Sequence, residues 1–250
     1  MLETIDHGPV RELRLARPPA NALNAPLLNA LNEALQRAPE EADAVVVSGA
    51  PGMFSAGLDV PELLEFDRPA FTSMWSLFID VHRTIAMMPI PTVFALTGHA
   101  PAGAILLAIF GDYRIMPEGS FKTGLNEVRI GLFVPDPPFS ALARLTGSRA
   151  AEKLVVTGEM IAADEAAEIG LVDELVPTPS DVVPRAIEWC RQHLEFPSEA
   201  LKATRDLARA DLHALFGVDN GPSGELFIDL WFSDSTQEKL QRLVAGLKKT

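Results

Sequence analysis

The side chain best suited to chemistry is Glu127, which stands in the mostly apolar segment 124–134, GLNEVRIGLFV. Apolar surroundings penalise an ionised carboxylate and raise its pKa towards neutrality. A carboxylate with such a pKa can take a proton from carbon and return it, which is general acid–base catalysis. The neighbours expected to provide these surroundings are Val128, Ile130, Leu132 and Phe133. The alternative is a surface carboxylate at the start of a strand or turn.

Two glycine-containing turns can supply the complementary part of a site. In FSAGLD, 54–59, the small residues Ser55, Ala56 and Gly57 let a ligand approach the backbone closely. The second turn, GHAPAGA at 98–104, precedes a helix expected from Gly103, whose first N–H groups lack partners within the helix. If the turns converge, their N–H groups form an oxyanion hole. Either turn alone is most simply a change of chain direction.

Short buried strands that alternate with helices are expected to position these turns. Leu13 and Leu15 alternate with charged residues, which predicts an early strand. Asn24 is expected to cap a helix that Pro26 opens. Further strands are predicted at 44–48, 92–96, 113–116 and 172–176, a turn at 97–102, and helices at 69–87 and 103–110.

Helices dominate the second half of the predicted structure. Ser148 is expected to cap a helix that ends at Gly158, and a further helix is expected at 162–168. From Asp181 onward helix follows helix, and the last is expected to open at Ser235 in capping-box spacing with Glu238. This order predicts an α/β core followed by a helical C-terminal part, without a flexible linker.

Composition excludes several classes of function. The 250 residues carry a formal net charge of −13, so neither nucleic acid nor an acidic membrane surface is an expected partner. Cys190 is the only cysteine, which rules out an intrachain disulfide and fits a reducing, cytoplasmic location. The histidines show no metal-site spacing, so no metal is expected. Prolines and glycines interrupt the uncharged stretch 84–111, which argues against a membrane span.

Several motifs together resemble one known family. PPANALN at 18–24, FSAGLD, the GHAPAGA turn and GDYRI at 111–115 occur in the order typical of the crotonase, or enoyl-CoA hydratase/isomerase, superfamily. The likeness continues through 145–176, so it covers most of the chain. It implies an α/β fold of repeated β-β-α units coiled into a right-handed spiral at 1–195. Residues 196–250 would be C-terminal helices used to form a homotrimer or a dimer of trimers.

The resemblance also implies a site. An acyl-CoA thioester would place its carbonyl oxygen between the backbone N–H groups of Leu58 and Gly103. Ser55, Ala56, Gly57, Ala102 and Asp136 would contact the substrate. Coenzyme A would be part of that substrate, and no separate cofactor is expected. Relatives often carry a lysine just before the FSAG turn, where this chain has Met53. We therefore expect Lys or Arg residues of the C-terminal helices to meet the phosphates.

The expected chemistry depends on which acids are present. Hydratases of the family use two glutamates, and the first of these positions is Leu106 here, whereas the second is Glu127. Leucine neither orients water nor transfers a proton. Segments 101–108 and 124–132 resemble the Δ3,Δ2-enoyl-CoA isomerase branch, in which one glutamate moves the proton.

Three alternatives stay open at this point. Asp136 lies near the position of a catalytic aspartate in some dienoyl-CoA isomerases, so that activity is one. A weak enoyl-CoA hydratase is the second. The third is a non-catalytic acyl-CoA-binding protein, in which Glu127 would point outward.

The C-terminal part contains a cluster of large apolar residues that predicts assembly. One exposed helix should not carry so much apolar surface, so we expect another subunit to cover it. The cluster consists of Leu226, Phe227, Leu230, Trp231 and Phe232.

Overall fold

The computed structural model describes residues 1–217 and 221–247, and its larger sheet has six strands in the order β1-β2-β3-β5-β7-β10. Only the hairpin β1–β2 is antiparallel, and every other neighbouring pair in this sheet is parallel. The strands are β1 Leu2–His7, β2 Val10–Leu15, β3 Ala44–Ser48, β5 Thr92–Ala95, β7 Tyr113–Pro117 and β10 Glu174–Val176. The expected strands are therefore confirmed, with small shifts at their ends.

The smaller sheet has four strands in the order β4-β6-β8-β9. Three times in succession the chain runs from the larger sheet to the smaller one and then into a helix, so β-β-α units repeat along a spiral. The predicted α/β spiral fold is confirmed. The strands are β4 Gly52–Met53, β6 Gly98–Pro101, β8 Lys122–Gly124 and β9 Met160–Ala162.

Strand β6 corrects the expectation of a turn at 97–102. Gly98 pairs with Gly52 and Ala100 pairs with Thr123, so successive units of the spiral supply both of its neighbours. A Cβ atom placed on Gly98 would overlap the backbone of Gly52, which only glycine permits. A glycine and a proline interrupt the segment, and no alternating pattern marks it as a strand. Its pairing depends on residues distant in sequence.

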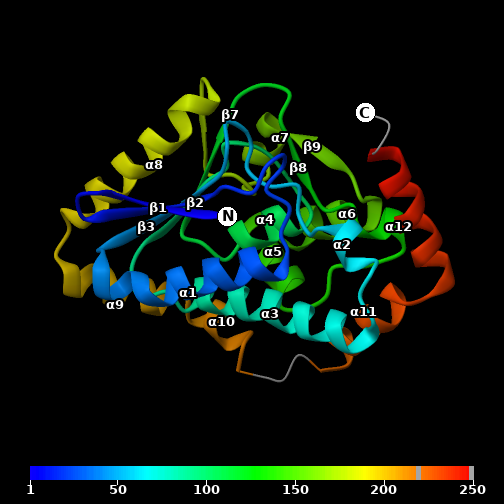
Figure 1. The fold of residues 1–250 in the computed structure, drawn as a ribbon. Helices are drawn as coiled ribbons and strands as arrows, with labels where there is room; N and C mark the ends of the chain where they lie inside the picture. Colours follow the sequence, from blue (N-terminus) through cyan, green and yellow to red (C-terminus); the bar gives the residue numbers. More distant parts are fainter. Residues whose placement is uncertain (218–220, 248–250) are drawn as a thin grey trace.

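Helices cover both faces of the larger sheet (Figure 1). Helices α1 and α3 lie side by side beneath it, and α8 lies on the opposite face, where Val182 and Ile187 pack against β3 and β5. This double coverage explains why β3 is buried at every position. The helices before residue 195 are α1 Ala25–Glu41, α2 Val60–Leu63, α3 Arg68–Ala86, α4 Gly103–Ala108, the 3-10 helix η1 Glu127–Ile130, α5 Pro138–Thr146, α6 Ser148–Thr157, α7 Ala163–Glu168 and α8 Pro179–Leu194.

Of the three helix starts predicted from a capping residue, one is right and two are displaced. The Asn24 side chain accepts a hydrogen bond from Leu27 N–H at 3.2 Å and caps α1 as expected. Ser148 is the first residue of α6, and Gly147 is its cap. The last helix begins at Asp234, where Ser233 Oγ accepts from Thr236 N–H at 3.4 Å. In both displaced cases a neighbouring residue able to start the helix precedes the expected serine.

The C-terminal helices fold back onto their own chain (Figure 1). Phe227 and Trp231 are buried, and they stack on Trp75 and Phe71 of α3 with ring centroids 4.0 and 4.3 Å apart. The expectation that these two aromatic residues form an intersubunit surface is therefore wrong, because they complete the core of this chain. These helices are α9 Ser198–Ala208, α10 Ala210–Ala214, α11 Gly221–Trp231 and α12 Asp234–Leu247. The division at residue 195 stays a prediction.

The uncharged stretch 84–111 becomes four short pieces. It contains the end of α3, strands β5 and β6, and helix α4. Within the described residues, every helix is too short or too polar to cross a lipid bilayer.

Candidate active site

A cavity of about 710 Å³ lies between the two glycine turns, η1 and the C-terminal helices. Five of the predicted site residues line it, namely Ala56, Leu58, Ala102, Gly103 and Glu127. The remaining wall consists of Arg17, Pro18, Pro19, Ala20, Ala22, Asp59, Val60, Pro61, Trp75, Phe78, Pro101, Leu106, Asn126, Ile130, Leu132, Phe133, Val134, Pro135, Phe227, Trp231 and Leu243. The wall is mainly apolar, as is usual for a small-molecule site.

The first glycine turn is held by segment 20–24. Leu23 N–H donates to Gly57 O at 2.8 Å, and Asp59 N–H donates to Leu23 O at 3.0 Å. Residues 57 and 59 thus bond to this segment, whereas Leu58, between them, lies on the cavity wall. Gly57 has φ 82°, a conformation that favours glycine.

Ser55 and Gly57 build this turn and do not line the cavity. The Ser55 hydroxyl is fully buried, donates to Asn21 O at 2.7 Å and accepts from Gly57 N–H at 3.1 Å. Both capacities of the hydroxyl are used inside the protein. The structure therefore gives Ser55 a positioning role in place of the expected substrate contact.

The second glycine turn places the N-terminus of α4 at the cavity. Ala102 N–H donates to Gly124 O at 2.8 Å, and Ala102 has φ 48°, which is uncommon for a residue with a side chain. Such conformations persist where the surrounding structure enforces them, often at functional sites. This turn makes Gly103 the first residue of α4, so its N–H lacks an intrahelical partner.

The two turns converge. A Cβ atom placed on Gly103 would lie 3.3 Å from Leu58 N, and one placed on Gly57 would lie 3.3 Å from Gly103 N. Within the described residues, neither Leu58 N–H nor Gly103 N–H donates to a protein acceptor. Two neighbouring unpaired amides beside an apolar cavity can stabilise an oxygen that gains negative charge.

Glu127 begins η1 and is only 8% exposed. Its Oε2 atom is buried without a hydrogen-bond partner among the described residues, and burial raises the pKa of the carboxyl to about 7. Ile130, Leu132 and Phe133 contribute to the apolar surroundings as expected, whereas Val128 is exposed and does not. A buried carboxyl with a near-neutral pKa can both accept and donate a proton under mild conditions.

Leu106 lies on the cavity wall, almost completely buried, one helical turn beyond Gly103. The only other carboxylate that the described residues place on the wall is Asp59, whose Oδ2 lies 2.7 Å from Arg17 Nη2. Among the described residues, Glu127 is therefore the one acidic group on the wall without an ion-pair partner.

Asp136 does not line the cavity. It is exposed, and its Oδ1 accepts a hydrogen bond from Ser140 Oγ at 2.6 Å near the start of α5. The placement does not support the expected substrate contact, because the carboxylate faces solvent and serves a local hydrogen bond.

Arg17 is a wall residue that the sequence analysis missed. It is the one basic side chain on the cavity wall among the described residues, and no Lys or Arg of the C-terminal helices lies there. Its guanidinium pairs with Asp59 and lies 3.5 Å from Glu62 Oε2. The sequence feature that could have revealed Arg17 is its position immediately before the PPANALN motif.

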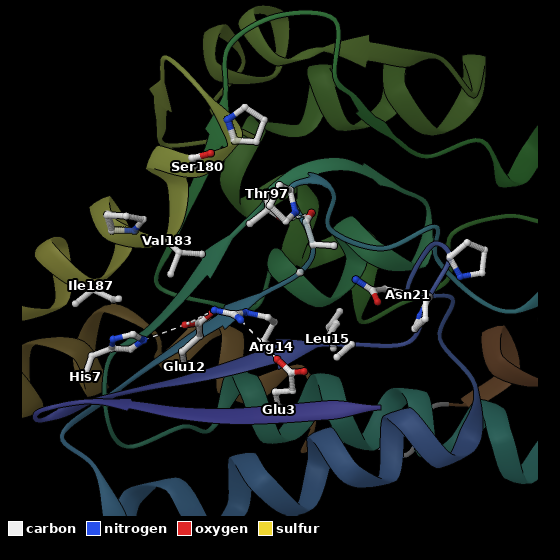
Figure 2. Close-up of a pocket in the computed structure, with 18 of the residues that line it drawn as sticks. Glu3, His7, Glu12, Arg14, Leu15, Asn21, Thr97, Ser180, Val183 and Ile187 are labelled. Atoms are coloured by element: carbon white, nitrogen blue, oxygen red, sulfur yellow. Dashed lines mark hydrogen bonds and ion pairs between the residues drawn. The ribbon is translucent and has the colours of Figure 1, made fainter.

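A second cavity, of about 920 Å³, lies between the β1–β2 hairpin and α8 (Figure 2). Its buried carboxylate, Glu12, accepts hydrogen bonds from Ser48 Oγ at 2.6 Å, Arg14 Nε at 2.9 Å and His7 Nε2 at 2.9 Å. Burial alone would raise the pKa of Glu12, but these partners together lower it. Glu12 is thus an ionised structural group, in contrast to the unpartnered Glu127.

Metal-ligating side chains do not gather in the described chain. No group of three His, Cys, Asp or Glu residues within it has the arrangement of a metal site.

Known proteins resemble this chain in sequence. A family profile described as Enoyl-CoA hydratase/isomerase matches residues 6–219. A probable enoyl-CoA hydratase, echA17, of Mycobacterium avium is 34% identical over 206 residues, covering 82% of this chain and 78% of that protein. The mitochondrial enoyl-CoA delta isomerase 1 of Homo sapiens is 27% identical over 244 residues, covering 96% of this chain and 80% of that protein.

Solved structures resemble it in fold. The human mitochondrial delta3-delta2-enoyl-CoA isomerase superposes with a TM-score of 0.92 at 27% identity, over 99% of this chain and 98% of that one. An enoyl-CoA hydratase/isomerase from Mycobacterium paratuberculosis gives a TM-score of 0.87 at 23% identity, over 96% and 97% of the two chains, which shows the shared fold. By sequence profile and by its relatives, this chain belongs to the enoyl-CoA hydratase/isomerase family.

Proposed function

We propose that this enzyme moves the double bond of a 3-enoyl-CoA to the 2-trans position. The observation that carries the proposal is a single unpaired carboxyl, Glu127, on the wall of a cavity that also exposes two unpaired amides. Leu106 occupies the position at which hydratases of the family need a second glutamate. One acid–base group is sufficient for proton migration.

The proposed reaction has two proton transfers and no net change in composition. The thioester oxygen accepts hydrogen bonds from Leu58 N–H and Gly103 N–H. Ionised Glu127 removes a proton from C2, and the C2–H electrons form a dienolate whose charge collects on that oxygen. Protonated Glu127 then returns the proton to C4, which leaves the double bond between C2 and C3. Each oxyanion donor is typically worth ~10²–10³ in rate, and general acid–base catalysis ~10²–10⁴.

Hydration is the second candidate, because relatives such as the mycobacterial protein are named enoyl-CoA hydratases. Adding water requires a group that orients and activates it, and a second carboxylate usually shares this task in the family. The aliphatic Leu106 side chain contributes no such group at its place on the wall. A cavity wall with one free carboxylate, Glu127, and an aliphatic Leu106 favours isomerisation over hydration.

Two further alternatives receive less support. A dienoyl-CoA isomerase that uses Asp136 would need this carboxylate in the cavity, and Asp136 faces solvent. A non-catalytic acyl-CoA-binding protein would have Glu127 turned outward, but Glu127 is buried on the cavity wall.

The test of the proposed function is a comparison of two substrates under equal conditions. Isomerisation of a 3-enoyl-CoA is followed by the absorbance of the conjugated product, and hydration of crotonyl-CoA by its loss. We expect rapid isomerisation and little hydration. Hydration comparable to isomerisation would contradict the subtype, and failure of both reactions would contradict an enzymatic role on these substrates.

The proposal extends to partners and location. Coenzyme A enters as part of the substrate, and we propose no separate cofactor, nucleic acid or membrane partner.

A homotrimer or a dimer of trimers is proposed because α9 buries none of its residues and exposes apolar ones, with Leu207 81% exposed. Light scattering that finds a monomer at micromolar concentration would contradict this. The lone buried Cys190 is compatible with the reducing cytoplasm that we propose as its location.

A further inference from the structure

The residues along the acyl-CoA cavity form a continuous series of contacts from a polar end to an aromatic end. Arg17 pairs with Asp59, which follows the oxyanion residue Leu58 in sequence. A Cβ atom placed on Gly103 would lie 3.4 Å from Phe78 Cζ, so Phe78 borders the oxyanion hole on its other side. The acyl chain fits the aromatic end, which is the apolar end of the cavity.

Beyond Phe78 the aromatic series continues along α3 and then crosses to α11. The Trp75 and Phe78 ring centroids are 5.8 Å apart, and the Trp75 ring stacks on Phe227 at 4.0 Å with an interplanar angle of 20°. The Phe227 ring also makes an edge contact with Phe133, at a centroid distance of 6.1 Å, and Phe133 lines the cavity as well. Together these rings form a wall across the aromatic end.

On α3 the cavity wall reaches Trp75 but not Phe71. Phe71 lies four residues before Trp75 on α3, about 6 Å further along the helix axis. It is buried behind Phe227 and Trp231 and does not line the cavity. Of these two α3 residues, Trp75 therefore lines the cavity and Phe71 does not, and Phe227 and Trp231 of α11 lie between Phe71 and the cavity.

We propose that Phe227 is a specificity-determining residue that stops the acyl chain, so the enzyme selects acyl groups below a limiting length. The inference rests on the proposed use of this cavity for acyl-CoA. Each additional methylene that is buried should tighten binding about fourfold. Once the chain reaches Phe227, a further methylene finds no apolar space, because the stacked Trp75 ring and the edge contact with Phe133 hold the Phe227 ring in place. The gain per methylene then ceases.

The experiment measures binding without turnover. Saturated acyl-CoAs from butanoyl- to dodecanoyl-CoA are titrated by calorimetry into the wild-type protein, Phe227→Leu and Phe227→Trp. The matched control is Leu226→Ala, which changes the adjacent residue of α11, 51% exposed. The Trp variant keeps an aromatic ring in the stack, so it tests the same position without opening the core.

We expect wild-type affinity to rise with chain length and to level off before dodecanoyl-CoA. In Phe227→Leu the rise should continue, so that the ratio of dodecanoyl- to butanoyl-CoA affinity exceeds the wild-type ratio at least tenfold. Phe227→Trp should lower octanoyl-CoA affinity and preserve that of butanoyl-CoA, and Leu226→Ala should follow the wild type.

Three results would overturn the role of Phe227. They are an unchanged profile in the Trp variant, an unchanged profile in a folded Leu variant, and a shift of equal size in Leu226→Ala. If the wild-type protein binds none of the acyl-CoAs, the proposed function itself fails, which is a distinct outcome.

Discussion

The amide nitrogen of Gly103 lies 3.3 Å from the position that a Cβ atom on Gly57 would occupy. A Cβ atom on Gly57 would also lie 3.1 Å from Pro101 O, and Gly57 has φ 82°. Side chains at Gly57 are therefore excluded both by the backbone conformation and by the approach of the second turn. This close approach brings the turn that carries Leu58 N–H next to Gly103 N–H.

Gly57→Ala should reduce kcat by ~10²-fold or more, because the added methyl group would separate the two donors of the proposed oxyanion hole. The strained conformation should also cost roughly 1–2 kcal/mol of stability. Steady-state kinetics and chemical denaturation measure the two effects. Gly8→Ala is the control, since Gly8 also has positive φ but its added Cβ would meet nothing within 4 Å. Equal kinetic losses in both variants would show that the close approach is unimportant.

The pH dependence of kcat/KM should show a rising limb near pH 7. Burial raises the pKa of Glu127 to about 7, and the first step requires the ionised form. Below that pH, kcat/KM should fall about tenfold per pH unit. A limb near 4 to 5, where an ordinary glutamate titrates, would show that the catalytic base lies in a water-exposed site.

Glu127→Gln should stabilise the protein at pH 8 but not at pH 4. The raised pKa of Glu127 means that the folded state keeps its proton while the unfolded chain ionises, so stability falls as pH rises from about 4.5 to about 7. The rise of the Glu127 pKa from 4.5 to about 7 corresponds to a loss of roughly 3 kcal/mol in the free energy of unfolding at high pH. The amide of the Gln variant does not ionise, so this variant avoids the loss. Denaturation of both proteins at the two pH values measures it, with exposed Glu118→Gln as the control. An equal effect at both pH values would refute the explanation.

Asp112→Asn should destabilise the docking of the C-terminal helices. The Asp112 carboxylate is 11% exposed and lies 2.8 Å from Arg205 Nη2 and 3.0 Å from Arg209 Nη1. Removing its charge leaves the buried guanidinium of Arg209 without its partner, which should cost about 3 kcal/mol. The exposed pair of Asp206 with Lys202 should cost under about 0.5 kcal/mol when Asp206→Asn removes it. Comparable losses in the two variants would contradict the anchoring role.

Features that depend on short segments could be predicted from the sequence. Strand β3 is a run of apolar residues, and the cap of α1 needs only Asn24 and the helix that follows it. Glu127 was recognised through the family resemblance, because the apolar segment alone also allowed a surface carboxylate, and its burial and near-neutral pKa agree with the apolar surroundings expected for it.

Features that depend on distant contacts could not be predicted in the same way. Phe227 looked like exposed surface because its partner Trp75 lies 152 positions earlier on α3. Strand β6 was missed because its neighbours belong to other units of the spiral. Asp136 was expected to contact substrate because sequence proximity to a motif does not reveal which way a loop residue points.

The most direct test of the account compares Glu127→Gln with Asp136→Asn on a 3-enoyl-CoA, with wild-type protein measured alongside. Glu127→Gln preserves shape but cannot accept a proton, and both proton transfers depend on this group, so the loss should be ~10⁴-fold or more. Binding of the CoA ester should change little, because the Leu58 and Gly103 amides remain. Asp136→Asn should retain near wild-type activity, since this carboxylate faces solvent. If the Gln variant keeps most of its activity while the Asn variant loses it, the proton transfer belongs to Asp136 and the assignment of Glu127 is wrong.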